Sequence, residues 1–266
     1  YVYLWQRKKL KEIANYSSWH FLGAFSNIVR DQGVNILLNV FFNPVVNAAR
    51  AIAFQVSTGV SGLTHSFFTA AKPQIYKLYG ANDLKNMYSL VERSSKMCFF
   101  LVALIAYPLL VNTEYVLALW LGKIPEYTLF FTQLVLIHSL IDSVSGPAIA
   151  SALATGRIRG FELISGGLTL LNLPVSYILL VLGYDPYSTM FVVIFLTYLT
   201  VVVRAFILKK LLGFSVRSYL NQIVLRLTLV GLIIPLPVWG LNHFQLNGFL
   251  YLVISTCFVW LMLILR

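Results

Sequence analysis

Acidic residues, cysteines and charged residues in general are scarce in this sequence. Only 9 of the 266 residues are Asp or Glu, charged residues make up 11%, and there are two cysteines. A soluble domain carries about a quarter charged residues, so this composition excludes an ordinary water-soluble fold. Cys98 and Cys257 lie far apart in apolar segments, which argues against a disulfide or a metal centre.

Sequence motifs of common enzymes are also missing. The chain contains no HExxH, GxSxG, Walker A or paired-cysteine pattern. Its four histidines do not gather with carboxylates into a recognisable catalytic set. We therefore expect no catalytic residues, no metal and no cofactor, and we interpret the protein as a non-enzyme.

Hydrophobic residues dominate what is present. They make up 59% of the chain, and the mean hydropathy is +0.79. Because a membrane-spanning helix needs about 20 apolar residues, the sequence predicts an all-α, polytopic membrane protein with about eight transmembrane helices. The predicted spans are 17–42, 45–70, 97–119, 128–153, 163–183, 188–208, 223–241 and 249–265.

Basic residues are distributed very unevenly about these spans. If residues 1–15 are placed in the cytoplasm, 17 of the 20 Lys and Arg residues fall on or beside the cytoplasmic segments. Lys123 alone falls outside, and Arg30 and Arg50 fall within spans. The net charge of +11 is therefore interpreted as a topology signal, and no nucleic-acid partner is needed to explain it.

The first two predicted spans carry unusual polarity. A stripe of Asn27, Asp31, Asn35 and Asn39 recurs every fourth residue, which places it along one slowly wrapping face of a helix. After the Asn43-Pro44 turn, polar residues continue at steps of three or four and at longer gaps: Asn47, Arg50, Ser57, Ser61 and His65. This pattern predicts either a polar cavity or hydrogen bonds between packed helices.

Two arginines lie within this hairpin. Arg30 and Asp31 are neighbours whose side chains point about 100° apart on a helix, so they do not pair automatically. Asp31 could instead meet Arg50, and Arg50 could also extend to the outer headgroups. If both arginines face a cavity, that cavity is cationic and suits a phosphate, because guanidinium pairs bidentately with phosphate.

Two further segments each allow two interpretations. His138 and Asp142 lie four residues apart on one helix face. They could form a proton relay, or they could form a hydrogen bond within the helix. In the stretch 72–96, Leu84, Met87 and Val91 recur at helical spacing. This pattern predicts an amphipathic helix on the inner membrane surface. The stretch could equally be a simple connector.

Longer segments show a family resemblance. NILLNVFFNPVVNAARAIAFQV, PQIYKLYGANDLKNMYSLVERSSK, LWLGKIPEYT and ATGRIRGFE, in this order, resemble the C-terminal half of Wzx-type polysaccharide (O-antigen) flippases. These belong to the multidrug/oligosaccharidyl-lipid/polysaccharide exporter superfamily. The likeness covers most of residues 1–215.

The resemblance implies a transporter of two helical bundles around a central cavity. Residues 1–16 would then be a basic cytoplasmic linker with the end of a preceding helix, 17–210 the second six-helix bundle, and 211–266 two additional helices. The implied partners are membrane lipids and an N-terminal half that is absent here. The implied location is the bacterial cytoplasmic (inner) membrane.

The implied function is translocation of a lipid-linked oligosaccharide, on undecaprenyl pyrophosphate, by alternating access. Arg30, Asn35, Asn47 and Arg50 are the candidate substrate-binding residues, and Asp31, His138 and Asp142 the candidates for ion coupling. The alternatives are a multidrug or small-molecule exporter of the same superfamily and a membrane-embedded polymerase or acyltransferase.

Overall fold

Helices account for nearly all of the chain that the structure describes. The structure is a computed structural model, and it describes residues 7–225, 228–229, 253–254, 256–258 and 260–261. Within these ranges the chain forms helices and no β-strand. The predicted all-α fold class is confirmed for this part of the chain.

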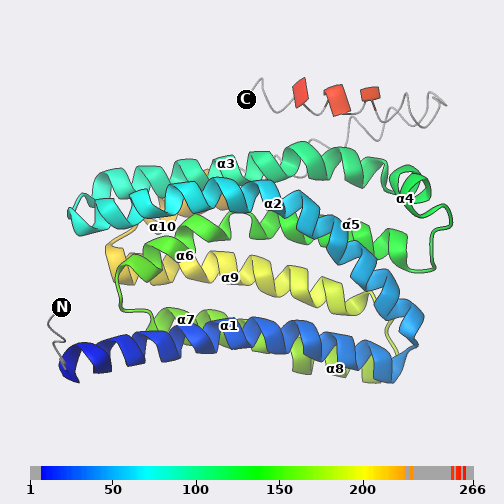
Figure 1. Ribbon diagram of the computed structural model, residues 1–266, viewed down its shortest axis with the longest axis horizontal. Coiled ribbons are helices and arrows are strands. Elements are labelled where there is room, and N and C mark those ends of the chain that lie inside the picture. Colours follow the sequence, from blue (N-terminus) through cyan, green and yellow to red (C-terminus); the bar gives the residue numbers. More distant parts are fainter. Residues whose placement is uncertain (1–6, 226–227, 230–252, 255, 259, 262–266) are drawn as a thin grey trace, which may run out of the picture.

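The helices run back and forth along one direction (Figure 1). In chain order they are α1 (Arg7–Phe41), α2 (Pro44–Gly80), α3 (Leu84–Val111), α4 (Thr113–Leu121), α5 (Thr128–Asp142), α6 (Ser145–Ala154), α7 (Arg159–Leu170), α8 (Asn172–Val181), α9 (Ser188–Leu212) and α10 (Val216–Tyr219). A short π-helical turn, η1 (Leu220–Leu225), follows α10.

The predicted turn at Asn43-Pro44 joins the two longest helices. The Asn43 side chain accepts hydrogen bonds from the backbone N–H groups of Val45 and Val46, and Pro44 occupies the first position of α2, which is favourable because proline has no N–H to satisfy. With 35 and 37 residues, α1 and α2 are each about 50 Å long. They meet at this turn and diverge toward their other ends (Figure 1).

Helix α1 begins at Arg7. The basic residues that were predicted to form a linker are therefore the first turns of this helix. The proposed division of the chain at residues 17 and 210 remains a prediction.

The stretch 72–96 does not form a separate surface helix. It consists of the end of α2, a turn around Asn82, whose φ of 57° is left-handed, and the start of α3. The Asp83 side chain caps α3 by accepting from the Asn86 N–H at 3.2 Å. Met87 and Val91 are fully buried, so the apolar spacing that predicted a membrane-surface face instead marks a face packed inside the bundle.

Two of the predicted spans are interrupted helices. Helices α5 and α6 are bent by 41° relative to each other at a short break, and Pro147 lies in the first turn of α6. Proline removes one backbone donor and clashes with the carbonyl four residues earlier, which accounts for a bend just before it. Helices α7 and α8 are separated only at Leu171.

Three helical segments are long and apolar enough to cross a membrane. They are α3, the α7–α8 pair and α9, and the bent α5–α6 pair is a fourth if it is counted as one span. Helices α1 and α2 are long enough but do not pass the same test of hydropathy and charge. The number of about eight spans stays a prediction, and predicted spans 223–241 and 249–265 lie largely outside the described residues.

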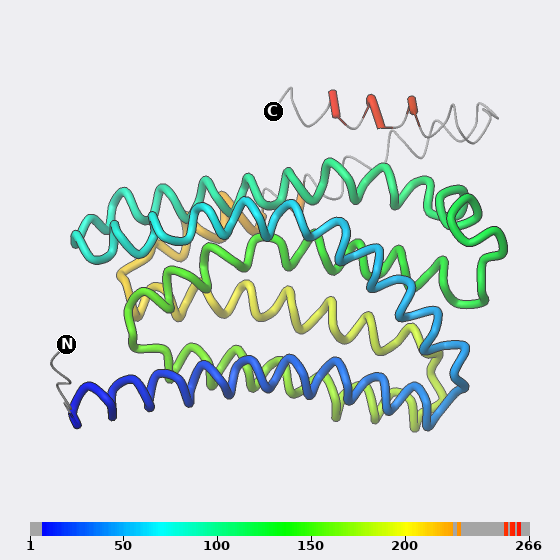
Figure 2. The backbone as a smooth tube through the Cα atoms, in the orientation of Figure 1, coloured from blue at the N-terminus to red at the C-terminus, as the bar shows by residue number. Residues whose placement is uncertain are grey.

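Figure 2 traces the backbone of these helices. Two apolar clusters hold them together. One lies near the α1–α2 turn and contains Val34, Leu38 and Phe131. The larger one surrounds α3 and contains Val102 and Leu208. Polar cavities lie beside the C-terminal half of α5.

Candidate functional site

The polar stripe of α1 is only partly directed at a common space. Asn27 and Arg30 line an internal cavity, whereas Asn35 faces α2. Asp31 pairs with its neighbour Arg30, since Arg30 Nε lies 2.8 Å from Asp31 Oδ1 and Nη2 lies 3.2 Å from Oδ2. Neighbouring side chains on a helix point about 100° apart, but the arginine side chain is long enough to bend toward Asp31. The Arg30–Asp31 ion pair is therefore present, although helical geometry alone did not require it.

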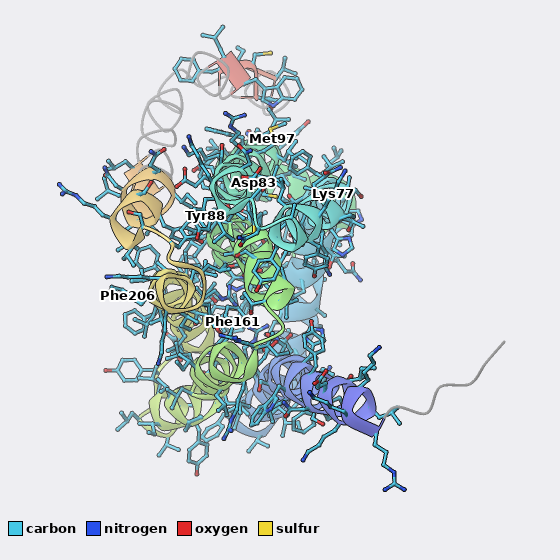
Figure 3. All side chains as sticks on the ribbon, turned by 90° about the vertical axis from the view of Figure 1, so that its left-hand side faces the viewer. Lys77, Asp83, Tyr88, Met97, Phe161 and Phe206 are labelled. Carbon is cyan, nitrogen blue, oxygen red and sulfur yellow. The ribbon has the colours of Figure 1, made fainter. Side chains whose placement is uncertain are left out.

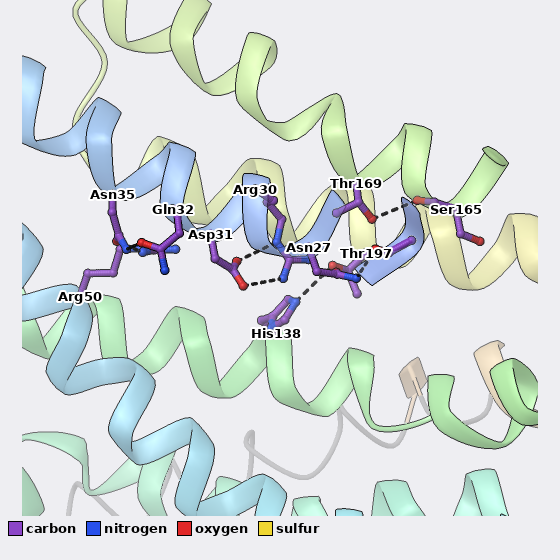
Figure 4. A network of polar contacts seen from close by, with 11 residues as sticks. Asn27, Arg30, Asp31, Gln32, Asn35, Arg50, His138, Ser165, Thr169 and Thr197 are labelled. Carbon is purple, nitrogen blue, oxygen red and sulfur yellow. Dashed lines mark hydrogen bonds and ion pairs between the residues drawn. The ribbon is translucent and has the colours of Figure 1, made fainter. Parts of the chain in front are cut away.

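The first cavity, called the cationic cavity below, lies among five helices (Figure 4). It has a volume of about 100 Å³. Its polar lining comes from Asn27 and Arg30 of α1, His138 and Asp142 of α5, Thr169 of α7, Asn172 of α8, and Thr197, Thr200 and Arg204 of α9. Two arginines and one carboxylate not engaged by either of them therefore share this space.

Arg204 is a candidate site residue that the sequence interpretation missed, since it lines the cationic cavity. It was counted with the cytoplasmic charges, but it lies eight residues before the end of α9, or about 12 Å inside it. Its Nε is buried and has no hydrogen-bond partner among the described residues, and its guanidinium lies 5.8 Å from the centre of the Phe161 ring. The signal was present in LTVVVRAFIL, where one arginine interrupts an apolar run.

No nearby phenolate neutralises Arg204. Tyr219, on the short helix α10, is fully buried, and burial raises its pKa to about 12. The phenol is therefore uncharged at neutral pH. Asp142 is the carboxylate that lines the cavity together with Arg204, and the two side chains form no ion pair with each other.

His138 points from α5 toward the labelled Asn27 and Thr197 in Figure 4. Its Nε2 is 3.2 Å from Thr197 Oγ1, and neither it nor Asp142 takes part in an ion pair among the described residues. Of its two predicted roles, the internal hydrogen bond to Asp142 is not formed, since His138 bonds to α9 instead. The two side chains nevertheless line the same cavity, as their spacing predicted.

A second cavity adjoins the first and shares His138 and Asp142 with it. It has a volume of about 220 Å³, and we call it the hydroxyl cavity. Its polar lining is Ser57, Ser61, Thr64 and His65 of α2 and Ser139 and Ser143 of α5. The Ser57 and Ser139 hydroxyls are 2.7 Å apart, whereas the Thr64 hydroxyl is buried without a partner among the described residues.

Arg50, Asn35 and Asn47 form a separate cluster between α1 and α2. The Arg50 side chain donates to the Asn35 side chain, and Asn47 Nδ2 donates to the Asn35 carbonyl at 2.9 Å. Arg50 is 4% exposed and lies 4.6 Å above the Phe54 ring, so it does not extend to the headgroups. The four predicted substrate residues are thus not brought into one pocket, because only Arg30 lines the cationic cavity.

Comparisons with known proteins add no family to this picture. No protein family model, curated protein or solved structure matches the chain. Among the described residues, no group of three or more His, Cys, Asp or Glu side chains could hold a metal ion.

Proposed function

We propose that this chain is the substrate-carrying half of a membrane transporter that moves a lipid-linked oligosaccharide across the bacterial cytoplasmic membrane. The observation that carries the proposal is the pairing of a cationic cavity with a hydroxyl cavity inside a bundle of apolar helices. In this proposal the substrate is transported and not chemically changed.

The cationic cavity supports an anionic group on the substrate. Arg204 forms no ion pair among the described residues, and its buried Nε has no hydrogen-bond partner there, which is costly for a charged group. A diphosphate would supply the missing negative charge and accept from both guanidinium groups. Undecaprenyl pyrophosphate carries such a group at the junction of lipid and sugar.

The hydroxyl cavity supports a polyhydroxylated group beside that anion. Serine and threonine hydroxyls both donate and accept, and the unpartnered Thr64 hydroxyl gains a bond only when a ligand or water enters. Phe68 also lines this space and offers an apolar face to a sugar ring. His138 and Asp142 would then lie where the diphosphate joins the first sugar.

An apolar groove lies between α1 and α8. It has a volume of about 350 Å³ and is lined by Gly33, Ile36 and Leu37 of α1 and Leu173, Pro174 and Tyr177 of α8. Gly33 is less than one turn from Arg30 of the cationic cavity. The lipid chain would occupy this groove while its diphosphate reaches Arg30.

The shape of the α1–α2 hairpin supports alternating access. The helices meet at Asn43 and diverge toward the ends rich in basic residues (Figure 1), which the charge distribution assigns to the cytoplasm. The cavities would thus accept substrate from inside. The N-terminal half of the transporter would complete the path, with Asp31, His138 or Asp142 coupling it to an ion gradient.

Complementation tests the function. The full-length gene is expressed in a bacterium that lacks its own polysaccharide flippase and is supplied with the genes for the matching glycan, and surface glycan is scored. The wild-type gene is expected to restore surface glycan. The Arg30→Ala variant is expected to lose it at an unchanged protein level. Absent glycan together with newly gained drug resistance would replace this proposal with that of a small-molecule exporter, although a cationic cavity disfavours cationic drugs.

A further inference from the structure

A wide groove lies between α9 and the short helices that follow it, away from both cavities described above. It has a volume of about 980 Å³. The residues that matter for its chemistry are Val202, Lys209, Arg217, Leu220, Asn221 and Val224. In Figure 3, α10 stands beside α9 near the labelled Phe206.

One end of this groove is basic. Lys209 is in the last turn of α9, and Arg217 is in α10. Both are exposed, and neither forms an ion pair with any residue that the structure describes. Asn221 adds a neutral donor nearby.

The remainder of the groove is apolar. Val202, Leu220 and Val224 line it, and α9 also exposes Phe195 and Phe206 at 66% and 56%. Helix α9 is one of the segments apolar enough to cross a membrane, so these side chains lie at the level of the lipid tails. The groove therefore has cations where the apolar span ends and hydrocarbon-compatible walls where it continues.

The walls are held in place by contacts with α3. Tyr88 donates to the carbonyl of Leu212, and its ring centre lies 4.5 Å from that of Phe214. Lys96 Nζ donates to Gln222 at 2.8 Å, and the Ser218 hydroxyl donates to Glu92 at 3.0 Å. The groove thus has a defined shape and is not a gap between loosely packed helices.

We propose that this groove binds an anionic phospholipid of the cytoplasmic leaflet. Its phosphate would lie between Lys209 and Arg217, with one acyl chain along Val202 and Val224. Basic pockets beside transmembrane helices recognise anionic headgroups in this way. A free anion would use only the basic end, whereas a phospholipid matches both the charge and the apolar walls.

The test measures lipids retained by the full-length protein in detergent, by native mass spectrometry. Phosphatidylglycerol and phosphatidylcholine with the same acyl chains are offered in equal amounts. The wild type is expected to retain phosphatidylglycerol in about tenfold excess. The double variant Lys209→Gln, Arg217→Gln is expected to lose that preference, and Lys210→Gln, which changes a neighbouring lysine outside the groove, is expected to keep it.

Two results would overturn the proposal. One is an unchanged preference in the double variant, and the other is displacement of phosphatidylglycerol by inorganic phosphate alone, which would mark a simple anion site. If the double variant does not fold, Val202→Trp fills the apolar wall while leaving both cations, and it is expected to reduce phospholipid retention. Since the readout is lipid binding, it is independent of transport.

Discussion

At the scale of single residues, the arginines inside the helices carry most of the functional information. Arg30, Arg50 and Arg204 differ in partners: a carboxylate for Arg30, an amide and an aromatic ring for Arg50, and one ring for Arg204. The sequence identified the first two because they lie within the two predicted spans that carry unusual polarity. It missed Arg204 because a basic residue near a helix end usually reaches toward the headgroups, and the apolar run around Arg204 does not by itself show that its side chain lines a cavity.

Replacing Arg204 tests the anion site. Arg204→Gln in the full-length protein removes one charge-assisted contact, worth about 1.5–3 kcal/mol, so surface glycan is expected to fall about tenfold or more. Arg204→Lys keeps the charge but not the planar fork and is expected to be intermediate. Arg157→Gln, in an exposed loop, is the matched control. Equal glycan in all three variants would contradict the role of Arg204.

Thr64 tests the hydroxyl cavity. Thr64→Val removes a buried hydroxyl that has no partner among the described residues, so stability is expected to be unchanged or to rise by about 1 kcal/mol. Glycan export is expected to fall, because the proposed function has this hydroxyl form a hydrogen bond to the substrate. The control is Thr58→Val, whose hydroxyl bonds within α2. A variant that loses stability and keeps export would refute the assignment.

At the scale of elements, the sequence predicted helices and polar faces better than helix ends. The polar stripe and the Asn43-Pro44 turn appear where the spacing placed them. Of the two interpretations of 72–96, the surface helix is wrong, because an amphipathic pattern reports one apolar face but not whether lipid or another helix covers it. Predicted span 128–153 was expected as one helix, and hydropathy alone could not reveal its bend.

Gly33 tests the close packing of α1 on α8. A Cβ at this position would lie 2.4 Å from Leu173 Cδ2, so Gly33→Ala must displace a packed leucine and is expected to cost about 1–3 kcal/mol. Gly167→Ala is the control, since its Cβ would meet nothing within 4 Å, and its helix propensity would improve. Thermal unfolding in detergent compares the two. A Gly33→Ala variant as stable as wild type would show that this contact yields easily.

At the scale of the whole molecule, the account depends on which end of the bundle faces the cytoplasm. Basic residues lie in the first turns of α1, near the end of α2 and in the first half of α3. Figure 1 shows that α1 and α2 diverge toward this end and that the turn between them lies at the other end. The charge bias predicted this orientation from sequence. The arrangement of two adjoining cavities could not be predicted, because it depends on contacts among α1, α2, α5 and α9 that are distant in sequence.

Cysteine labelling tests the orientation. Lys85→Cys and Lys123→Cys are placed singly in a background with Cys98→Ala and Cys257→Ser, and intact spheroplasts are treated with a membrane-impermeant maleimide. Lys123→Cys is expected to react at once, and Lys85→Cys only after permeabilisation. The reverse pattern would place the open end of the hairpin outside and invalidate entry of substrate from the cytoplasm.

The most direct test of the central claim is binding of a fluorescent polyprenyl pyrophosphate to the purified full-length protein. The account predicts saturable binding that weakens about tenfold or more in Arg30→Ala and in Arg204→Gln, since each loses a contact to the diphosphate, and that is unchanged in Arg157→Gln. Binding of equal strength in all four proteins would contradict the claim that the cationic cavity holds the anionic group of the substrate.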